Sequence, residues 1–184
     1  MDNFQNKTAL IIGGTSGIGR ATAQMLLNAG ATVHVVGMNT DKIEDRDQLL
    51  KHRVNISDTS EANRLIQTIE SLDNLDYLVN AAGIFGPKSF LDHTQADYDS
   101  YLDLNRGFFF ITQAAAKKMK ATGGGSIVNI GSMWAKQAVK ATPSSAYSMQ
   151  KAGLHSLTQH LAMELADHGD RKSTRLNSSH QIIS

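Results

Sequence analysis

The chain has 184 residues, which is enough for one domain with a sizeable core and not comfortably enough for two. Apolar residues make up 41% and charged residues 19%, which excludes a disordered chain, and the lack of cysteine excludes disulfides, thiolate metal sites and a cysteine nucleophile. The formal net charge is +1 with both signs dispersed, and no stretch resembles a membrane span or a signal peptide, so we expect a cytoplasmic protein with no nucleic-acid or membrane partner.

Strand-like and helix-like segments alternate along the chain, with short connections and no internal repeat. Short, nearly continuous apolar runs predict strands at 8–12, 31–36, 75–79 and 126–130, with a shorter strand near 53–56. Helical patterns lie at 17–28, 41–51, 58–71, 94–120 and 146–166. This alternation predicts an α/β fold built on a parallel sheet whose two faces are covered by helices.

The predicted helix at 94–120 carries further signals. Thr94 and Asp97 are spaced as in a capping box at its start. Apolar residues recur at helical spacing and predict a buried stripe made of Tyr98, Leu102, Phe109 and Ala116. Asn105 falls on the same stripe, where a buried amide needs hydrogen-bond partners, and by itself it is explained as a helix-packing residue.

A glycine-rich turn follows the first predicted strand and opens the first helix. Its residues are Gly13, Gly14, Thr15, Ser16, Gly17, Ile18 and Gly19. Glycine permits positive φ and close backbone approach, and the N–H groups at a helix start attract anions, so we expect this turn to bind the phosphates of a dinucleotide. A turn without a ligand is the alternative. The turn lacks the Lys-Ser/Thr pair of nucleoside triphosphatases, which disfavours ATP hydrolysis.

Tyr147 and Lys151 are four residues apart on a predicted helix, so a phenol and an ammonium can reach one site. Ser132 comes just past the strand at 126–130, at the sheet edge where open parallel sheets bind ligands. An adjacent ammonium, together with an oxidised nicotinamide, would lower the pKa of the phenol from its usual value of about 10. The structural alternatives are a strand-end cap for Ser132 and a solvated lysine for Lys151.

In this order along the chain, the residues resemble the short-chain dehydrogenase/reductase family in its compact single-domain branch. The resemblance covers residues 5–169 and rests on the glycine turn at 13–19, the Asn-Ala-Ala-Gly segment at 80–83, Asn105, Ser132, and Tyr147 with Lys151. It implies a Rossmann-type doubly wound parallel sheet, of which five of the usual seven strands are present.

The resemblance also implies a function, which is hydride transfer between NAD(P)(H) and an alcohol or ketone carbon of a small molecule. Tyr147 would be the general acid or base, and Ser132 would hold the reacting oxygen. Lys151 would lower the pKa of Tyr147 and bind the nicotinamide ribose, while Asn105 would support a water-linked proton relay. Homo-oligomers would pair through the fourth and fifth helices. The implied cofactor-binding residues are Gly13, Thr15, Ser16, Gly17, Ile18, Gly19, Met38, Asn39, Asn55, Ile56, Asn80, Ala81, Gly83, Tyr147 and Lys151.

Some positions depart from the family pattern. Ile12 replaces a Thr whose hydroxyl ties the glycine turn to the Asn80 segment, and we expect a small structural loss. Asn55 replaces an adenine-binding Asp but keeps an acceptor oxygen, so adenine binding should survive. Ser132 and Tyr147 are fifteen residues apart, so we expect an enlarged loop beside the substrate pocket.

The end of the second predicted strand bears on the choice of cofactor. An NAD enzyme would place an acidic residue there, but 36–39 reads Val-Gly-Met-Asn and Asp41 comes several residues late. An NADP enzyme would favour Arg at the position of Met38. We expect NADP to be favoured weakly, with its extra phosphate held by Asn39, Thr40 and Lys42.

Residues 170–184 are polar and aperiodic, and they resemble translated sequencing-adapter sequence. We therefore expect the dinucleotide-binding domain to span 1–169, with a natural polar tail at 170–184 as the alternative. The family would continue with a sixth strand, a Pro-Gly turn, a substrate-covering segment and a seventh strand. We expect a domain that is incomplete at its C-terminus, with a bare fifth strand, and that is poorly stable or inactive.

Two other functions remain as alternatives. A non-catalytic dinucleotide-binding module would keep the glycine turn but need not keep Ser132, Tyr147 and Lys151 together. An extended-branch epimerase or dehydratase shares the Tyr and Lys but has a different glycine spacing. His155 and His160 are five residues apart and off a common helix face, so we expect no metal site.

Overall fold

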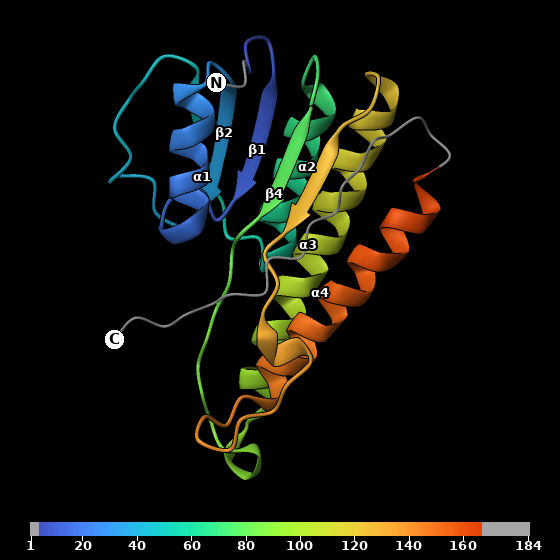
Figure 1. Cartoon of the computed structure of the whole chain (residues 1–184). Helices are drawn as coiled ribbons and strands as arrows, with labels where there is room; N and C mark the ends of the chain where they lie inside the picture. The colour runs from blue at the N-terminus through green and yellow to red at the C-terminus, as the bar shows by residue number, and fades with distance from the viewer. Residues whose placement is uncertain (1–3, 167–184) are drawn as a thin grey trace.

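The computed structural model describes residues 4–166, which form a parallel sheet with helices on both faces (Figure 1). The strands are β1 (Thr8–Ile12), β2 (Thr32–Gly37), β3 (Leu49–Arg53), β4 (Tyr77–Asn80) and β5 (Ser126–Asn129). They lie in the order β3-β2-β1-β4-β5, and every neighbouring pair is parallel. Because the chain moves outward from β1 on both sides, the sheet is doubly wound, as predicted for a Rossmann-type α/β fold.

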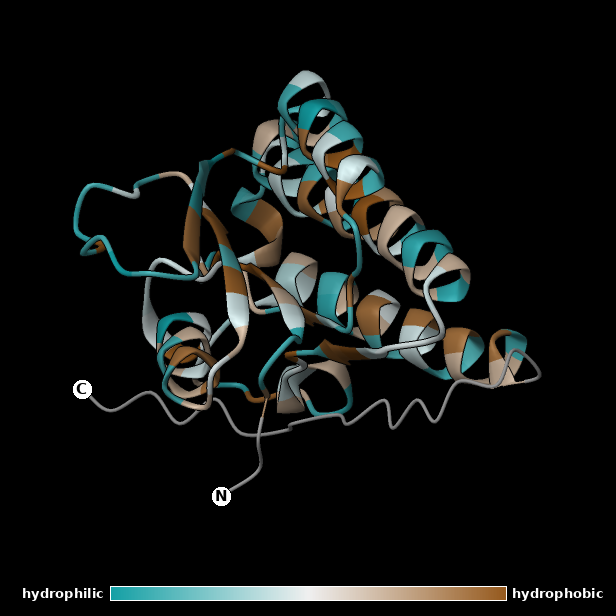
Figure 2. Cartoon of the chain, turned by 90° about the horizontal axis from the view of Figure 1, so that it is seen from above, coloured by the Kyte–Doolittle hydropathy of each residue, from teal (hydrophilic) through white to brown (hydrophobic). Residues whose placement is uncertain are grey.

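The helices are α1 (Gly17–Asn28), α2 (Thr59–Ser71), α3 (Gln95–Ala121) and α4 (Ser145–Glu164), with short 3-10 turns η1 (Phe90–Asp92) and η2 (Met133–Ala135). All five residues of β1 are buried, and they alternate between two cores. Ala9 and Ile11 pack with Ala23 of α1. Leu10 and Ile12 pack with the apolar faces of α2 and α3. Figure 2 shows hydrophobic colour on the strands and in patches along the helices, alternating with hydrophilic colour.

The segment before β3 differs from the prediction. We expected a helix at 41–51 and a strand near 53–56, but the chain forms turns after β2 and β3 starts at Leu49. The Asn39 side chain accepts the Asp41 N–H at 2.9 Å, a local bond that competes with helix formation. Leu49 pairs with Val33 of β2, so the sheet takes up residues whose local pattern favours a helix.

The buried face of α3 also differs from the predicted stripe. Tyr98, Leu102 and Phe109 are 37%, 44% and 47% exposed. Ala116, the fourth residue of the predicted stripe, is buried as predicted. The other buried residues of this helix are Tyr101, Leu104, Gly107, Phe108, Ile111, Thr112, Ala114, Ala115 and Met119. A Cβ on Gly107 would lie 2.1 Å from the Ile56 carbonyl oxygen, so the glycine lets this face of α3 approach the loop that follows β3. The capping box of Thr94 and Asp97 is confirmed.

Within residues 4–166, no helix is long and apolar enough to cross a membrane. In the same part of the chain β5 pairs only with β4, so it forms one edge of the sheet. The segment at 170–184 lies outside the described residues.

Candidate active site

The glycine turn between β1 and α1 is closed by tight backbone contacts. Gly13 has a φ of +81°, and a Cβ there would lie 2.4 Å from the backbone nitrogen of Ala82. A Cβ on Gly19 would lie 2.3 Å from the carbonyl oxygen of Gly13. Only glycine permits these approaches, which bring the start of α1 against the segment that follows β4.

The N-terminus of α1 faces open space. Ser16 is the N-cap residue, but its hydroxyl makes no capping hydrogen bond to the first turn. Gly17 has a φ of +51°, and a Cβ built on it would have no atom within 4 Å. Since the first N–H groups of a helix have no partner inside the helix, this end offers donors and a positive dipole to an anion. A dinucleotide phosphate fits these features.

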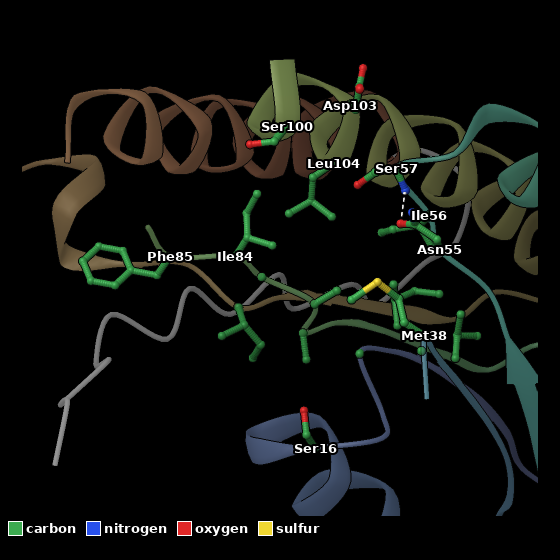
Figure 3. Close-up of a pocket in the computed structure, with 18 of the residues that line it drawn as sticks. Ser16, Met38, Asn55, Ile56, Ser57, Ile84, Phe85, Ser100, Asp103 and Leu104 are labelled. Atoms are coloured by element: carbon green, nitrogen blue, oxygen red, sulfur yellow. Dashed lines mark hydrogen bonds between the residues drawn. The ribbon is translucent and has the colours of Figure 1, made fainter. Parts of the chain in front are cut away.

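A cavity of about 910 Å³ lies at the carboxyl ends of the strands, next to this helix start. Figure 3 shows Ser16 of α1 on one side of it and Ser100, Asp103 and Leu104 of α3 on the other, with Ile84 and Phe85 at one end and Met38 and Asn55 at the other. The volume is in the range of cofactor sites. The predicted cofactor residues that line it are Gly13, Thr15, Ser16, Gly17, Ile18, Met38, Asn55, Ile56, Ala81, Gly83, Tyr147 and Lys151.

Five predicted site residues do not line the cavity, and they are Gly19, Asn39, Asn80, Asn105 and Ser132. Gly19 packs under the Gly13 carbonyl, and Asn39 bonds within its own turn. Ser132 is completely buried, and its hydrogen bond with Tyr147 acts to lower the pKa of that phenol.

The end of the cavity at Met38 and Asn55 is lined by both apolar and polar side chains. The Met38 side chain is 65% exposed. Asn55 Oδ1 accepts the Ser57 N–H at 3.1 Å, so the acceptor expected to serve adenine already has one partner. The Asn55 N–H donates to the Glu61 carboxylate at 2.7 Å, which fixes the loop after β3. A carbonyl oxygen has a second lone pair, so adenine contact at Asn55 stays a prediction.

Asn80 points into the interior and holds the sheet to α3. Its Nδ2 donates to Thr112 Oγ1 at 2.9 Å and to Asn129 Oδ1 at 2.8 Å. Asn129 Nδ2 in turn donates to Thr158 Oγ1 of α4 at 2.8 Å. Asn80 Oδ1 is buried and finds no partner in the described part of the chain; it lies beside Ile12, whose side chain offers no hydroxyl. The sequence prediction missed Thr112, Asn129 and Thr158, because single polar residues in apolar elements give no spacing signal.

Tyr147, Ser132 and Lys151 lie close together. Lys151 is 4% exposed, its Nζ donates to the Ile130 carbonyl at 3.0 Å, and this Nζ lies 5.8 Å from the centre of the Tyr147 ring. Ser132 Oγ accepts the Trp134 N–H at 3.3 Å, so the strand-end cap and the contact with Tyr147 coexist. The i, i+4 spacing on α4 therefore brings both predicted groups to the cavity.

The protonation of these groups follows from burial. Burial raises the pKa of Tyr147, against a smaller lowering by its hydrogen bond with Ser132 and a further increase from Tyr101. Burial lowers the pKa of Lys151 to about 8. The direction for Tyr147 is opposite to the lowering expected from an adjacent ammonium and an oxidised nicotinamide, because burial is the largest influence on the pKa of this phenol in the protein alone.

Asn105 lies between α3 and α4. Its Nδ2 donates to the Gln150 carbonyl at 3.2 Å, and its Oδ1 is buried and has no partner among residues 4–166. Both polar atoms of the Gln150 side chain are also buried, with no partner among the residues that the structure describes. A helix-packing role explains the hydrogen bond of Asn105 Nδ2 to α4. Asn105 Oδ1 is left free to accept a hydrogen bond from a water or a ligand group.

Aromatic side chains that the sequence prediction did not include surround Tyr147. The Phe85 ring meets the Tyr147 ring edge to face at 4.9 Å between centroids, and Tyr101 lies 6.2 Å away. The Tyr101 hydroxyl accepts the Gly86 N–H at 3.0 Å and so holds the loop that carries Phe85. Loop aromatics give no periodic signal, so only the fold could bring them to the site.

Histidine does not build a metal site in the part of the chain that the structure describes, where no group of three or more potential ligand residues is found. His155 is 8% exposed and both of its ring nitrogens are buried without partners. His160 lies 3.9 Å from the Glu164 carboxylate on the surface of α4.

Comparison with known proteins gives consistent matches along the chain. The family described as short chain dehydrogenase matches residues 7–174. An uncharacterized oxidoreductase of Thermotoga maritima is 33% identical over 178 residues, which cover 92% of this chain and 70% of the relative.

Solved structures agree with this match. The short chain dehydrogenase of Leptospira borgpetersenii with bound NAD+ superposes with a TM-score of 0.84 at 26% identity, over 97% of this chain and 75% of that one. A putative NAD(P) dependent gluconate 5-dehydrogenase of Beutenbergia cavernae with bound NADP gives a TM-score of 0.82 at 28% identity, over 91% of this chain and 70% of that one. By sequence and by fold, the chain belongs to the short chain dehydrogenase family of oxidoreductases.

Proposed function

We propose that this protein transfers a hydride between NAD(P)(H) and the alcohol or ketone carbon of a small molecule, with Tyr147 as the general acid or base. One observation carries the proposal. The Tyr147 phenol, in contact with Ser132, lines the same cavity as the open N-terminus of α1. A single ligand in this cavity can therefore place its phosphates at the helix and its reactive end at the phenol.

A bound reduced nicotinamide would supply the hydride. The chain supplies the proton, because the raised pKa of Tyr147 keeps its phenol protonated at neutral pH. In carbonyl reduction Tyr147 Oη donates this proton to the oxygen, and Ser132 Oγ hydrogen-bonds the same oxygen. Lys151 stays fixed through Ile130 and stabilises the phenolate that forms. Asn105 Oδ1, buried without a partner, is the acceptor through which a water relay would return the proton.

The cofactor preference is part of the proposal. The carboxyl end of β2 carries Gly37 and the exposed side chain of Met38, with no carboxylate before Asp41. This supports NADP(H) over NAD(H), since an acidic residue at this place holds the ribose hydroxyls of NAD. Titration with both reduced cofactors tests the preference, and tighter binding of NADH would reverse it.

Self-association is also proposed. Exposed apolar side chains gather on α3 and α4, where Phe109, Phe110, Met149 and Met163 are 47%, 48%, 59% and 78% exposed. Covering them favours pairing of these two helices between copies of the chain. Light scattering tests this pairing, and a monomer at micromolar concentration would contradict it.

The substitution Tyr147→Phe tests the catalytic role. It removes the proton donor and keeps the ring packed against Phe85, so ketone reduction should fall about a hundredfold or more. The dissociation constant of NADPH should change by less than about twofold, a shift well below 1 kcal/mol. Tyr98→Phe is the matched control, because Tyr98 lies on the exposed face of α3 away from the cavity.

The same experiment separates the alternatives. Unchanged turnover in Tyr147→Phe would contradict the catalytic role of the phenol. Binding of NADPH with no reduction of any ketone by the unsubstituted protein would favour a non-catalytic dinucleotide-binding module.

A further inference from the structure

The reactive end of the cavity has an aromatic wall, which we define as Phe85 and Tyr147, which line the cavity, together with Trp134 and Tyr101, which pack against these two rings. Phe85 lies 4.9 Å from Tyr147 and 6.3 Å from Trp134 between ring centroids. Tyr101 closes the back of the group at 6.2 Å from Tyr147. Ile84 and Phe85 remain 37% and 38% exposed at the cavity surface, so part of this apolar wall is available to a ligand.

The loops that carry the wall are fixed. The Lys88 N–H donates to the Pro143 carbonyl at 3.0 Å, which joins the loop after β4 to the loop before α4. The Tyr101 hydroxyl binds the Gly86 N–H and supports the first loop from α3. Lys88 also pairs with Asp97 at 2.5 Å. The wall is therefore preformed and does not depend on a ligand to assemble it.

Most of the charged side chains that line the cavity are acidic. Asp58, Asp99 and Asp103 line it, and among the lining residues that the structure describes Lys151 is the only cation. The Lys151 ammonium is buried and donates to Ile130 at the base of the site. The Asp103 carboxylate forms an ion pair with the Arg106 guanidinium at 2.9 Å. A substrate with its own carboxylate or phosphate would meet two carboxylates of α3 along the cavity. The one cation near the aromatic wall, Lys151 at 5.8 Å from the Tyr147 ring centre, is buried and already donates to the Ile130 carbonyl.

From the aromatic wall and the acidic rim we propose that the substrate is an uncharged alcohol or ketone that carries a flat apolar group next to its reacting carbon. The inference rests on the proposed function and names its substrate class. The flat group lies against Phe85, and the reacting oxygen meets Tyr147 Oη. Aromatic rings favour offset or edge-to-face contacts at the spacing of Phe85, Trp134 and Tyr147.

Three ketones test the substrate class in steady-state reduction by NADPH. They are acetophenone, its carboxylated analogue para-acetylbenzoate, and the small polar ketone dihydroxyacetone. Acetophenone should give kcat/KM values at least about tenfold above both others, which corresponds to about 1.4 kcal/mol of discrimination. Asp99→Asn should narrow the gap between acetophenone and para-acetylbenzoate by about threefold, since it removes one repelling charge.

Binding gives an independent readout because Trp134 is the only tryptophan of the chain and packs beside Phe85. Titration with 1-phenylethanol, the alcohol formed from acetophenone, should change the Trp134 fluorescence in a saturable way. Phe85→Ala should weaken this binding by about tenfold or more, because it removes the exposed ring of the wall. Phe90→Ala is the matched control, since Phe90 is 75% exposed and outside the cavity.

The outcomes separate this inference from the proposed function. Reduction of para-acetylbenzoate or dihydroxyacetone as efficiently as acetophenone would overturn the inference and leave the oxidoreductase function in place. An unaltered affinity for 1-phenylethanol in Phe85→Ala would also overturn it. If NADPH binds and no ketone is reduced, the proposed function fails and the inference fails with it.

Discussion

Gly13→Ala tests the close approach on which the glycine turn depends. Gly13 has a φ of +81°, a conformation that costs an alanine about 1–2 kcal/mol. Its Cβ would lie 2.4 Å from Ala82 N and 2.6 Å from Ala82 Cα. These are backbone atoms that cannot rotate away, so overpacking adds about 1–3 kcal/mol. The free energy of unfolding should therefore fall by about 2–5 kcal/mol.

Urea denaturation followed by circular dichroism measures this loss. Gly123→Ala is the matched control, because Gly123 has a φ of +100° and no atom within 4 Å of a Cβ. It should lose only the conformational part, about 1–2 kcal/mol. If Gly13→Ala destabilises the protein no more than Gly123→Ala, the contact between Gly13 and Ala82 is refuted.

Two further predictions concern the cofactor end of the site and the edge of the sheet. Gly17→Ala should lower the free energy of unfolding by only about 1–2 kcal/mol, since its Cβ meets open space. It should raise the NADPH dissociation constant about tenfold, because the added methyl group occupies the phosphate position. An unchanged dissociation constant in NADPH fluorescence titrations would contradict this prediction. His34 stacks on His52 with 3.0 Å between Nδ1 and Nε2, and burial, with a smaller contribution from the charge of His52, lowers the pKa of His34 from 6.5 to about 4. Because His34 then binds a proton more readily in the unfolded chain than in the folded one, the free energy of unfolding should fall by at most about 3 kcal/mol as the pH drops from 6.5 to 4. In His34→Leu, the midpoint of urea unfolding should depend less on pH over this range.

The parts of the fold that the sequence predicts well are those where one signal dominates. The apolar run at 8–12 becomes β1, which is buried at every residue. The spacing of Thr94 and Asp97 marks the start of α3 because the capping box is a local arrangement. Local signals and the final structure agree at these places, so propensity and patterning suffice.

In two other segments, tertiary contacts rather than local sequence signals determine the structure. The helix predicted at 41–51 loses to the pairing of Leu49 with Val33, which no local pattern encodes. α3 is apolar on more than one face, and the approach of Gly107 to Ile56 selects the buried one. A single sequence does not show which neighbour a helix will meet.

The candidate site divides in the same way. Local spacing in the sequence identifies the glycine turn and the pair Tyr147 and Lys151, and the fold brings both to one cavity. The spacing does not predict the rise in the Tyr147 pKa, because burial depends on Phe85 and Tyr101 from distant segments. The inward turn of Asn80 also depends on Thr112 and Asn129, which only the folded chain brings together.

Isotope transfer tests the central claim most directly. The protein is given NADPH deuterated at the hydride-donating carbon together with acetophenone, and the alcohol formed is analysed by mass spectrometry. Hydride transfer at the Tyr147 site predicts deuterium on the carbinol carbon of the product, and a loss of this product in Tyr147→Phe. A protein that binds the labelled cofactor but forms no deuterated alcohol from this or any other ketone would contradict the account.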